Sequence, residues 1–193
     1  MPGNPAERKP RVPVMSSVPP VVARRLHIGG KERREGWEIF DALPGDGVNH
    51  LGDAADLARF PDGTFDALYA SHVLEHFDYH QRIGLVLREW RRVLKPGGTL
   101  YVSVPDLERL CHLYLTPGLA PEGRFHVMRM MFGGHIDAYD YHMAGIDERF
   151  LAGELQAAGF ITGRRVQSFD LFEDSSTLRF LGMPISLNMI ATR

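Results

Sequence analysis

Short apolar runs rich in β-branched and aromatic residues recur along the chain from residue 22 onward, with polar loops or helical patterns between them. Runs of this kind predict strands. The predicted strands are residues 25–29, 37–42, 48–51, 65–71, 99–105, 161–169 and 184–192. The last two leave little room for a helix between them, so we expect an antiparallel pair joined by a loop around residues 174–182.

Helical periodicity is clearest over residues 78–94, where Ile83, Val86, Leu87 and Trp90 fall on one face. The tetrapeptide Lys95-Pro96-Gly97-Gly98 is expected to end this helix, because it combines a cation, a helix breaker and two flexible residues. Further helices are predicted after Asp106, over residues 122–132, and from Asp147 as N-cap to Gly159.

Strands separated by helices indicate an α/β fold. We expect a Rossmann-like, mostly parallel sheet with helices on both faces and an antiparallel C-terminal strand pair. Only seven residue steps separate Gly30 from Trp37, a span of about 23–25 Å when extended, which cannot include a helix. The first crossover helix is therefore missing, and this disfavours NAD or FAD, whose pyrophosphate binds at the start of that helix.

Composition divides the chain into two parts. It has 193 residues, of which 44% are hydrophobic and 24% charged, enough to form a core. Six of its thirteen prolines lie in the first twenty residues. We expect residues 1–21 to be a proline-rich flexible extension and residues 22–193 to form the domain.

Charge and cysteine content exclude several classes of function. The formal net charge of −2 argues against a nucleic-acid partner, although residues 1–34 carry eight Lys or Arg against Glu7 and Glu32. This basic stretch is interpreted as a solvated tail. The single cysteine, Cys111, excludes a disulfide framework. No apolar run has the length of a membrane span, and prolines interrupt any signal-peptide core, so a cytoplasmic location is expected.

Candidate ligand-binding residues follow three predicted strands. Gly29 and Gly30 end the first strand and allow close approach of a ligand to the backbone. Asp41 ends the second strand, eleven residues after Gly30, where its carboxylate could accept hydrogen bonds from ribose hydroxyls. Asp53 and Ala54 follow the third strand and either contact an adenine edge or form an Asx turn.

Four motifs in order resemble the class I S-adenosylmethionine-dependent methyltransferases, most of all a short subgroup of the type-11, ubiquinone-methylase-like domains. The motifs are Asp53-Ala54 with Leu57, Phe60-Pro61-Asp62-Gly63-Thr64-Phe65-Asp66, Ala70-Ser71-His72-Val73-Leu74-Glu75-His76 and Arg92-Val93-Leu94-Lys95-Pro96-Gly97-Gly98. The resemblance implies S-adenosylmethionine as the cofactor, contacted by His27, Gly29, Gly30, Asp41, Asp53, Ala54, Ser71 and His72. It implies that the two glycines face the methionine moiety, Asp41 the ribose, and Asp53 with Ala54 the adenine.

The glycine loop departs from the family pattern, because Lys31-Glu32 stands where the family has a third glycine followed by a helix. This departure leaves open the alternative that the chain is a methyltransferase-like binding domain without catalytic activity. Cofactor binding separates the two hypotheses.

The segment from His72 to His76 also spells H-x-x-E-H, a zinc motif of some metallohydrolases. Zinc would need a third ligand, which no recognisable pattern supplies, so no metal site is expected and a zinc hydrolase is the weakest alternative. Glu75 and His76 otherwise order the loop or contact the substrate.

The polar and aromatic segment 133–142 is expected to be either a substrate wall or a surface loop. His76 and His142 are the candidate catalytic residues, since histidine takes up protons near neutral pH. Together these features predict methyl transfer to an oxygen or nitrogen atom of a small-molecule or sugar-like acceptor, with no nucleic-acid or membrane partner.

Overall fold

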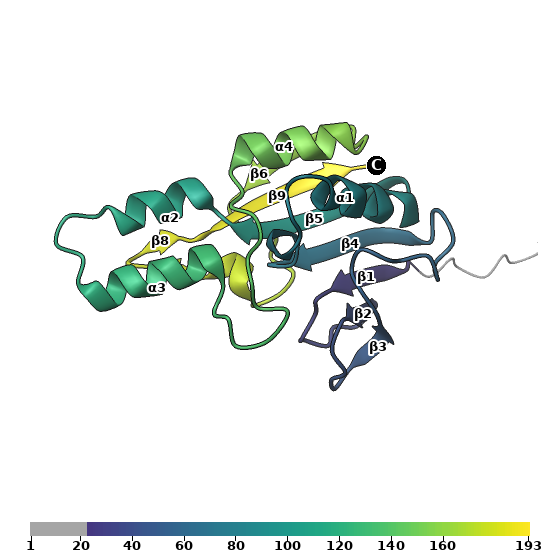
Figure 1. The fold of residues 1–193 in the computed structure, drawn as a ribbon. Helices are drawn as coiled ribbons and strands as arrows, with labels where there is room; N and C mark the ends of the chain where they lie inside the picture. Colours follow the sequence, from purple (N-terminus) through teal and green to yellow (C-terminus); the bar gives the residue numbers. More distant parts are fainter. Residues whose placement is uncertain (1–22) are drawn as a thin grey trace, which may run out of the picture.

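A seven-stranded sheet organises residues 23–193, the part of the chain that the computed structural model describes (Figure 1). The predicted extension 1–21 lies outside the described residues. The strand order is β3-β2-β1-β4-β5-β9-β6. The strands are β1 Arg25–Ile28, β2 Trp37–Asp41, β3 Val48–Leu51, β4 Phe65–Ser71, β5 Leu94–Pro105, β6 Thr162–Val166 and β9 Ser186–Thr192.

Strands β1 to β5 are parallel, whereas β9 runs antiparallel to both β5 and β6. The predicted mostly parallel sheet with an antiparallel C-terminal pair is therefore confirmed. The loop within that pair contains the 3-10 helix η2 Ser175–Thr177 and a small hairpin of β7 Arg179–Phe180 and β8 Met183–Pro184.

The helices are α1 Arg82–Val93, α2 Leu107–Tyr114, α3 Pro121–Phe132 and α4 Glu148–Ala157, with the 3-10 helix η1 Leu74–His76. Asp147 caps α4 as predicted, accepting a hydrogen bond from Phe150 N at 2.8 Å. Helix α1 ends at Val93, just before Lys95, as predicted, but its predicted start at residue 78 and the predicted strand start at residue 99 are wrong. Helix α1 starts at Arg82, because the Asp78 carboxylate binds His80 N in a turn. The Lys95–Gly98 tetrapeptide belongs to β5, which already pairs with β4 at Leu94.

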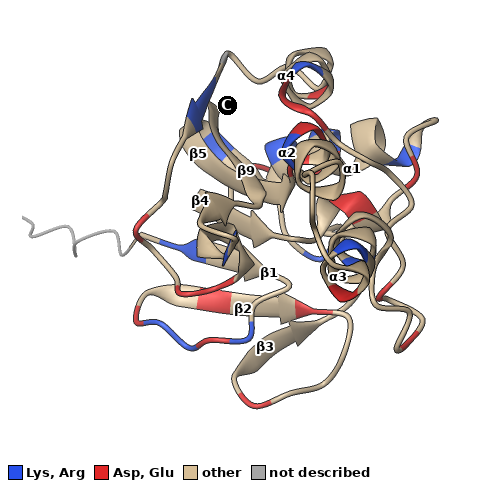
Figure 2. Ribbon diagram, turned by 90° about the vertical axis from the view of Figure 1, so that its left-hand side faces the viewer, with Lys and Arg blue, Asp and Glu red and all other residues tan. Residues whose placement is uncertain are grey.

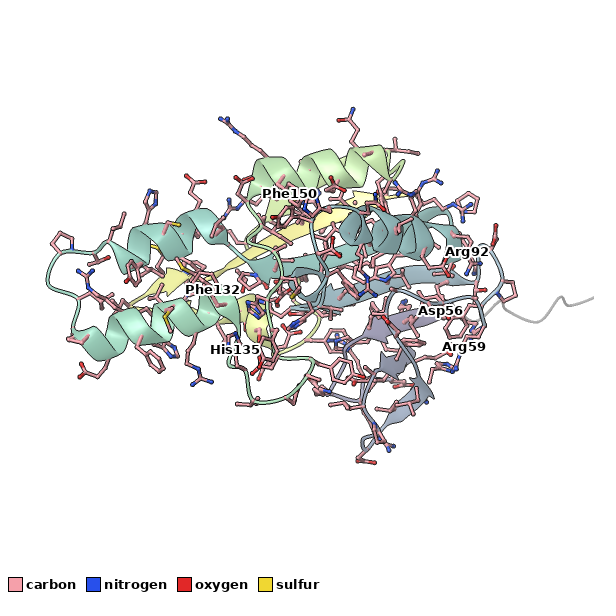
Figure 3. All side chains as sticks on the ribbon, viewed as in Figure 1. Asp56, Arg59, Arg92, Phe132, His135 and Phe150 are labelled. Atoms are coloured by element: carbon pink, nitrogen blue, oxygen red, sulfur yellow. The ribbon has the colours of Figure 1, made fainter. Side chains whose placement is uncertain are left out.

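One face of the sheet carries the main core. Helix α1 buries the predicted apolar stripe there, and α4 packs beside it (Figure 1). In Figure 2 the helices lie to one side of β5 and β9. The loop 52–64 closes the same core and is tied to α1, because the Arg92 guanidinium donates to Leu57 O, Phe60 O and the Asp62 carboxylate (Figure 3).

The opposite face carries no long helix from residues 23–193, so the helices expected on both faces of the sheet are found on one face only in this part of the chain. Residues 29–36 join β1 to β2 without a crossover helix, as the short connection predicts. The loop 167–178 covers the centre of this face instead. Phe172 packs against the rings of His27, Tyr69 and Trp37, and the Tyr69 hydroxyl donates to Asp174 Oδ2 at 2.8 Å. This face is therefore covered by aromatic side chains of an irregular segment.

A second, smaller core lies beyond the carboxyl ends of the strands. There α2 and α3 pack against each other and against the β7–β8 hairpin, burying Leu110, Leu113, Val127 and Ile185. Among the described residues, no helix has both the length and the apolarity needed to cross a bilayer.

Candidate functional site

A cavity of about 600 Å³ opens where the parallel strands end at their carboxyl termini. Its size suits a nucleoside-sized ligand. The lining residues come from the ends of β1 and β2, from the loops after β3 and β4, and from the segment before α4. They include Gly29, Lys31, Asp41, Asp53, Ala54, His72, His76, Arg82 and residues 136–141 with Met143.

Gly29 sits at the floor of this cavity with φ +73°, a conformation that favours glycine. A Cβ at this position would lie 2.6 Å from Val73 Cγ2 on the loop after β4. Both the backbone angle and the close packing therefore require glycine. The turn leaves bare backbone facing the cavity, where a ligand can approach closely.

Asp41 ends β2 with its side chain 6% exposed. Its Oδ2 accepts from Lys31 Nζ at 2.7 Å, and its Oδ1 accepts from Leu43 N at 2.8 Å. Lys31 itself is 75% exposed. Because each carboxylate oxygen has two lone pairs, Asp41 keeps acceptor capacity for a diol at the cavity.

Asp53 and Ala54 line the same cavity, but Asp53 also forms the Asx turn considered from the sequence. Its Oδ1 accepts from Ala55 N at 2.8 Å, while its Oδ2 lies 3.8 Å from Arg82 Nη2. Ala54 O accepts from the Trp90 indole at 2.9 Å, which fixes this loop to α1.

Three of the predicted cofactor contacts are absent from the cavity lining, namely His27, Gly30 and Ser71. A Cβ on Gly30 would lie 2.6 Å from the His27 ring, so Gly30 packs on the histidine. The ring of His27 is buried against Tyr69 and Phe172 on the opposite face of the sheet. His27 thus supports the glycine loop from below.

Burial lowers the pKa of His27 to about 4. Between about pH 6.5 and about pH 4, His27 is therefore protonated in the unfolded chain but not in the folded chain. Through His27, we expect the free energy of unfolding to decrease by about 3 kcal/mol as the pH falls from about 6.5 to about 4. Urea unfolding at several pH values, compared between the wild type and His27→Gln, measures this contribution. Equal pH dependence in the two proteins would contradict the assignment.

His72 turns the chain out of β4 with φ +55°, an uncommon angle for a non-glycine residue. Its Nε2 hydrogen-bonds Ser186 Oγ at 2.9 Å, and burial lowers its pKa to about 4. Strain of this kind is held in place by surrounding contacts and clusters at functional sites. The turn directs the following residues, through His76, along the cavity wall.

Glu75 and two histidines cluster beside the cavity. Glu75 is 1% exposed, and neither of its carboxylate oxygens accepts a hydrogen bond from the described residues. Its Oε1 lies 3.5 Å from His72 Nδ1 and 3.9 Å from His142 Nε2. Burial raises the pKa of Glu75 to about 8. The structure thus brings together His76 and His142, 66 residues apart in the sequence, with a carboxylate between them.

Both histidines are oriented through Nδ1. His76 Nδ1 lies 3.0 Å from Tyr141 O, and His142 Nδ1 lies 3.3 Å from Met131 O. A carbonyl oxygen only accepts hydrogen bonds, so each Nδ1 carries the proton and each Nε2 keeps its lone pair. Burial and the neighbouring His76 lower the pKa of His142.

The segment after α3 forms a wall of the cavity, as one of the two readings of its sequence expects. His135, labelled in Figure 3, stacks on Tyr141 with ring centroids 4.1 Å apart. Glu75 O accepts from Met143 N at 2.8 Å and from Ala144 N at 3.2 Å. These contacts fix the wall to the loop after β4.

Sequence reasoning missed Lys31 as the partner of Asp41, and it missed Arg82 and Phe77 at the cavity. It also treated Glu75 only as a residue that orders the loop or contacts substrate. The signal for Glu75 was present, because a charged residue among Val73, Leu74 and Phe77 is expected to be buried only with a partner.

A sequence model of the methyltransferase domain family matches residues 39–102, which run from β2 into β5. None of the curated proteins compared with the chain matches it significantly.

Solved structures resemble the chain over most of its length. An S-adenosylmethionine-dependent methyltransferase from Archaeoglobus fulgidus has a TM-score of 0.55 at 19% identity, covering 89% of this chain and 86% of that one. One from Thermotoga maritima has a TM-score of 0.53 at 20% identity, covering 88% and 81%.

The 1,6-didemethyltoxoflavin-N1-methyltransferase of Burkholderia thailandensis, solved with 1,6-didemethyltoxoflavin and S-adenosylhomocysteine, has a TM-score of 0.53 at 16% identity, covering 89% and 71%. The chain spans only about half the length of some other methyltransferases, 50% and 51% in two cases. At these identities the similarity shows the fold.

Proposed function

We propose that this protein is a class I S-adenosylmethionine-dependent methyltransferase that transfers the methyl group to an oxygen or nitrogen atom of a small-molecule or sugar-like acceptor. One observation carries the proposal. Gly29 and Asp41, at the ends of adjacent parallel strands, line one cavity that His76 also lines.

The residues present fit S-adenosylmethionine. The backbone at Gly29, where Val73 leaves no room for a Cβ, would lie beside the methionine moiety, and the Asp41 carboxylate would hold the ribose hydroxyls. Asp53 Oδ2 and the Ala54 backbone would face the adenine. The bound cofactor supplies an electrophilic methyl group, so the protein has to position an acceptor and exclude water.

His76 and His142 would provide the basic groups on the acceptor side. In each ring Nδ1 faces a carbonyl oxygen, which leaves Nε2 as the nitrogen available to an acceptor, and His76 lies on the cavity wall itself. The wall of residues 136–141 with Met143 supplies hydroxyl and apolar surface for a small ligand. A small acceptor is also what the Burkholderia thailandensis structure holds, a nitrogen-containing molecule beside S-adenosylhomocysteine.

Calorimetric titration with S-adenosylhomocysteine, followed by mass spectrometry after incubation with S-adenosylmethionine, tests the proposal. We expect saturable binding, and a methylated product from at least one member of a panel of hydroxylated molecules, amines and sugar derivatives. No binding at millimolar ligand would overturn the proposal. Binding without any methylated product would favour the non-catalytic alternative that the shortened glycine loop suggests.

A further inference from the structure

The unpaired carboxylate of Glu75 needs a partner. A buried ionised carboxylate without a hydrogen-bond donor is costly, and such groups are generally paired with a cation or bound to a metal. Among the described residues, no Lys or Arg makes an ion pair with Glu75. Its nearest polar neighbours are the imidazoles of His72 and His142, at 3.5 and 3.9 Å.

The two histidines of the cluster are arranged as metal-bound histidines usually are. Metal-ligating histidine donates its second ring N–H to a carbonyl or carboxylate, which fixes the ring and the tautomer. His76 donates Nδ1–H to Tyr141 O, and His142 donates to Met131 O. Each of the three residues offers one ligand atom, and these atoms lie within 4.8 Å of one another. For His142 the nitrogen nearest the Glu75 carboxylate is Nε2, 3.9 Å from Oε1.

We propose that Glu75, His76 and His142 form a binding site for a divalent transition-metal cation such as Zn²⁺ or Co²⁺. Two imidazoles and one carboxylate suit these cations, whose bonds to nitrogen and oxygen measure about 2.0–2.2 Å. Small rotations of the His76 and His142 rings would draw the three ligand atoms together. His72 stays outside the ligand set, because only Glu75, His76 and His142 offer ligand atoms that all lie within 4.8 Å of one another.

This ligand set differs from the H-x-x-E-H zinc motif considered from the sequence, in which the two histidines bind and the glutamate acts as a base. Here the glutamate is a ligand, the first histidine of the motif is not, and His142 supplies the third position from the distant wall segment. The sequence expectation of no metal site rested on the lack of a third ligand, which the fold provides.

Three protein ligands would leave a position for a further ligand, and His76, one of the three, lines the cavity. A hydroxyl or amine coordinated there would lose a proton to solvent more readily than in water. This consequence rests on the proposed function, whereas binding of the cation does not.

Chelator-treated full-length protein should be titrated with Co²⁺ alone, followed by visible absorption, and with Zn²⁺ alone by calorimetry. We expect one cation per chain, and a loss of affinity of at least tenfold in Glu75→Gln and in His142→Gln. His126→Gln, on the exposed side of α3, should bind as the wild type does. Glu75→Gln keeps the size of the buried side chain and removes its charge.

Wild-type protein that binds neither cation at millimolar concentration would overturn the site, as would undiminished affinity in Glu75→Gln and His142→Gln. Binding of S-adenosylhomocysteine, measured on the same samples, separates the two proposals. If the protein binds no cation but still transfers methyl groups, only the proposal of a metal site is refuted. If the protein binds the cation but transfers no methyl group, only the proposed function is refuted.

Discussion

Replacing His76 with alanine is expected to lower kcat for methyl transfer by about 10²- to 10⁴-fold, the usual cost of losing a proton-accepting group. The binding of S-adenosylhomocysteine should change little, because the proposed cofactor contacts come from β1, β2 and the loop after β3. His76 is the imidazole that lies on the cavity wall with its Nε2 free. Whether that nitrogen takes a proton or holds a cation, alanine removes its lone pair.

The matched control is His80→Ala, which removes an exposed histidine four residues further along the same loop. Steady-state kinetics of formation of the methylated acceptor give kcat, and calorimetry with S-adenosylhomocysteine gives the cofactor affinity. A kcat for His76→Ala within a few-fold of the His80→Ala value would remove His76 from the acceptor side of the site.

Asp41→Ala is expected to weaken S-adenosylhomocysteine binding by about 2–3 kcal/mol, or roughly 30- to 150-fold in Kd. The carboxylate is buried and is the hydrogen-bond acceptor proposed for both ribose hydroxyls. Its removal also leaves Lys31 without its anion at the rim of the cavity.

Asp46→Ala is the control, since it removes the same charge from the β2–β3 connection, where Asp46 is exposed and pairs with Arg33. Isothermal calorimetry on the two variants and the wild type gives the comparison. An Asp41→Ala Kd equal to that of Asp46→Ala would refute the ribose assignment.

Most of the sheet could be predicted from the sequence because its strands are buried and bounded by turn residues. The 65–71 strand, for example, reads as a continuous apolar run ending in polar residues, and its bounds are those of β4. The α1 boundary could not be predicted in the same way. Whether Asp78 starts a helix or forms a turn depends on the hydrogen bonds that its carboxylate accepts from His80 N and Gln81 N.

The residues of the candidate site that lie at strand ends could be predicted from the sequence, but the tertiary contacts of the site could not. Asp41 and Gly29 follow from the rule that ligands bind at the carboxyl ends of parallel strands. His27 lies in β1, two residues before Gly29, yet its side chain faces the opposite side of the sheet. Its closeness to Gly29 in the sequence therefore does not make it a cavity residue. The cluster at Glu75 depends on the wall segment folding back over η1, a contact that no local pattern reports.

The position of β9 in the sheet has a consequence for the order in which the chain folds. Strand β9 lies between β5 and β6, so β6 has no sheet partner until residues 186–192 have been synthesised. The aromatic segment that supports the glycine loop through Phe172 likewise comes from the C-terminal quarter of the chain. Pairings between such distant segments raise contact order and slow folding. The floor of the cavity, although built from the first strands, is therefore expected to become ordered only late in folding, after the C-terminal strand has inserted.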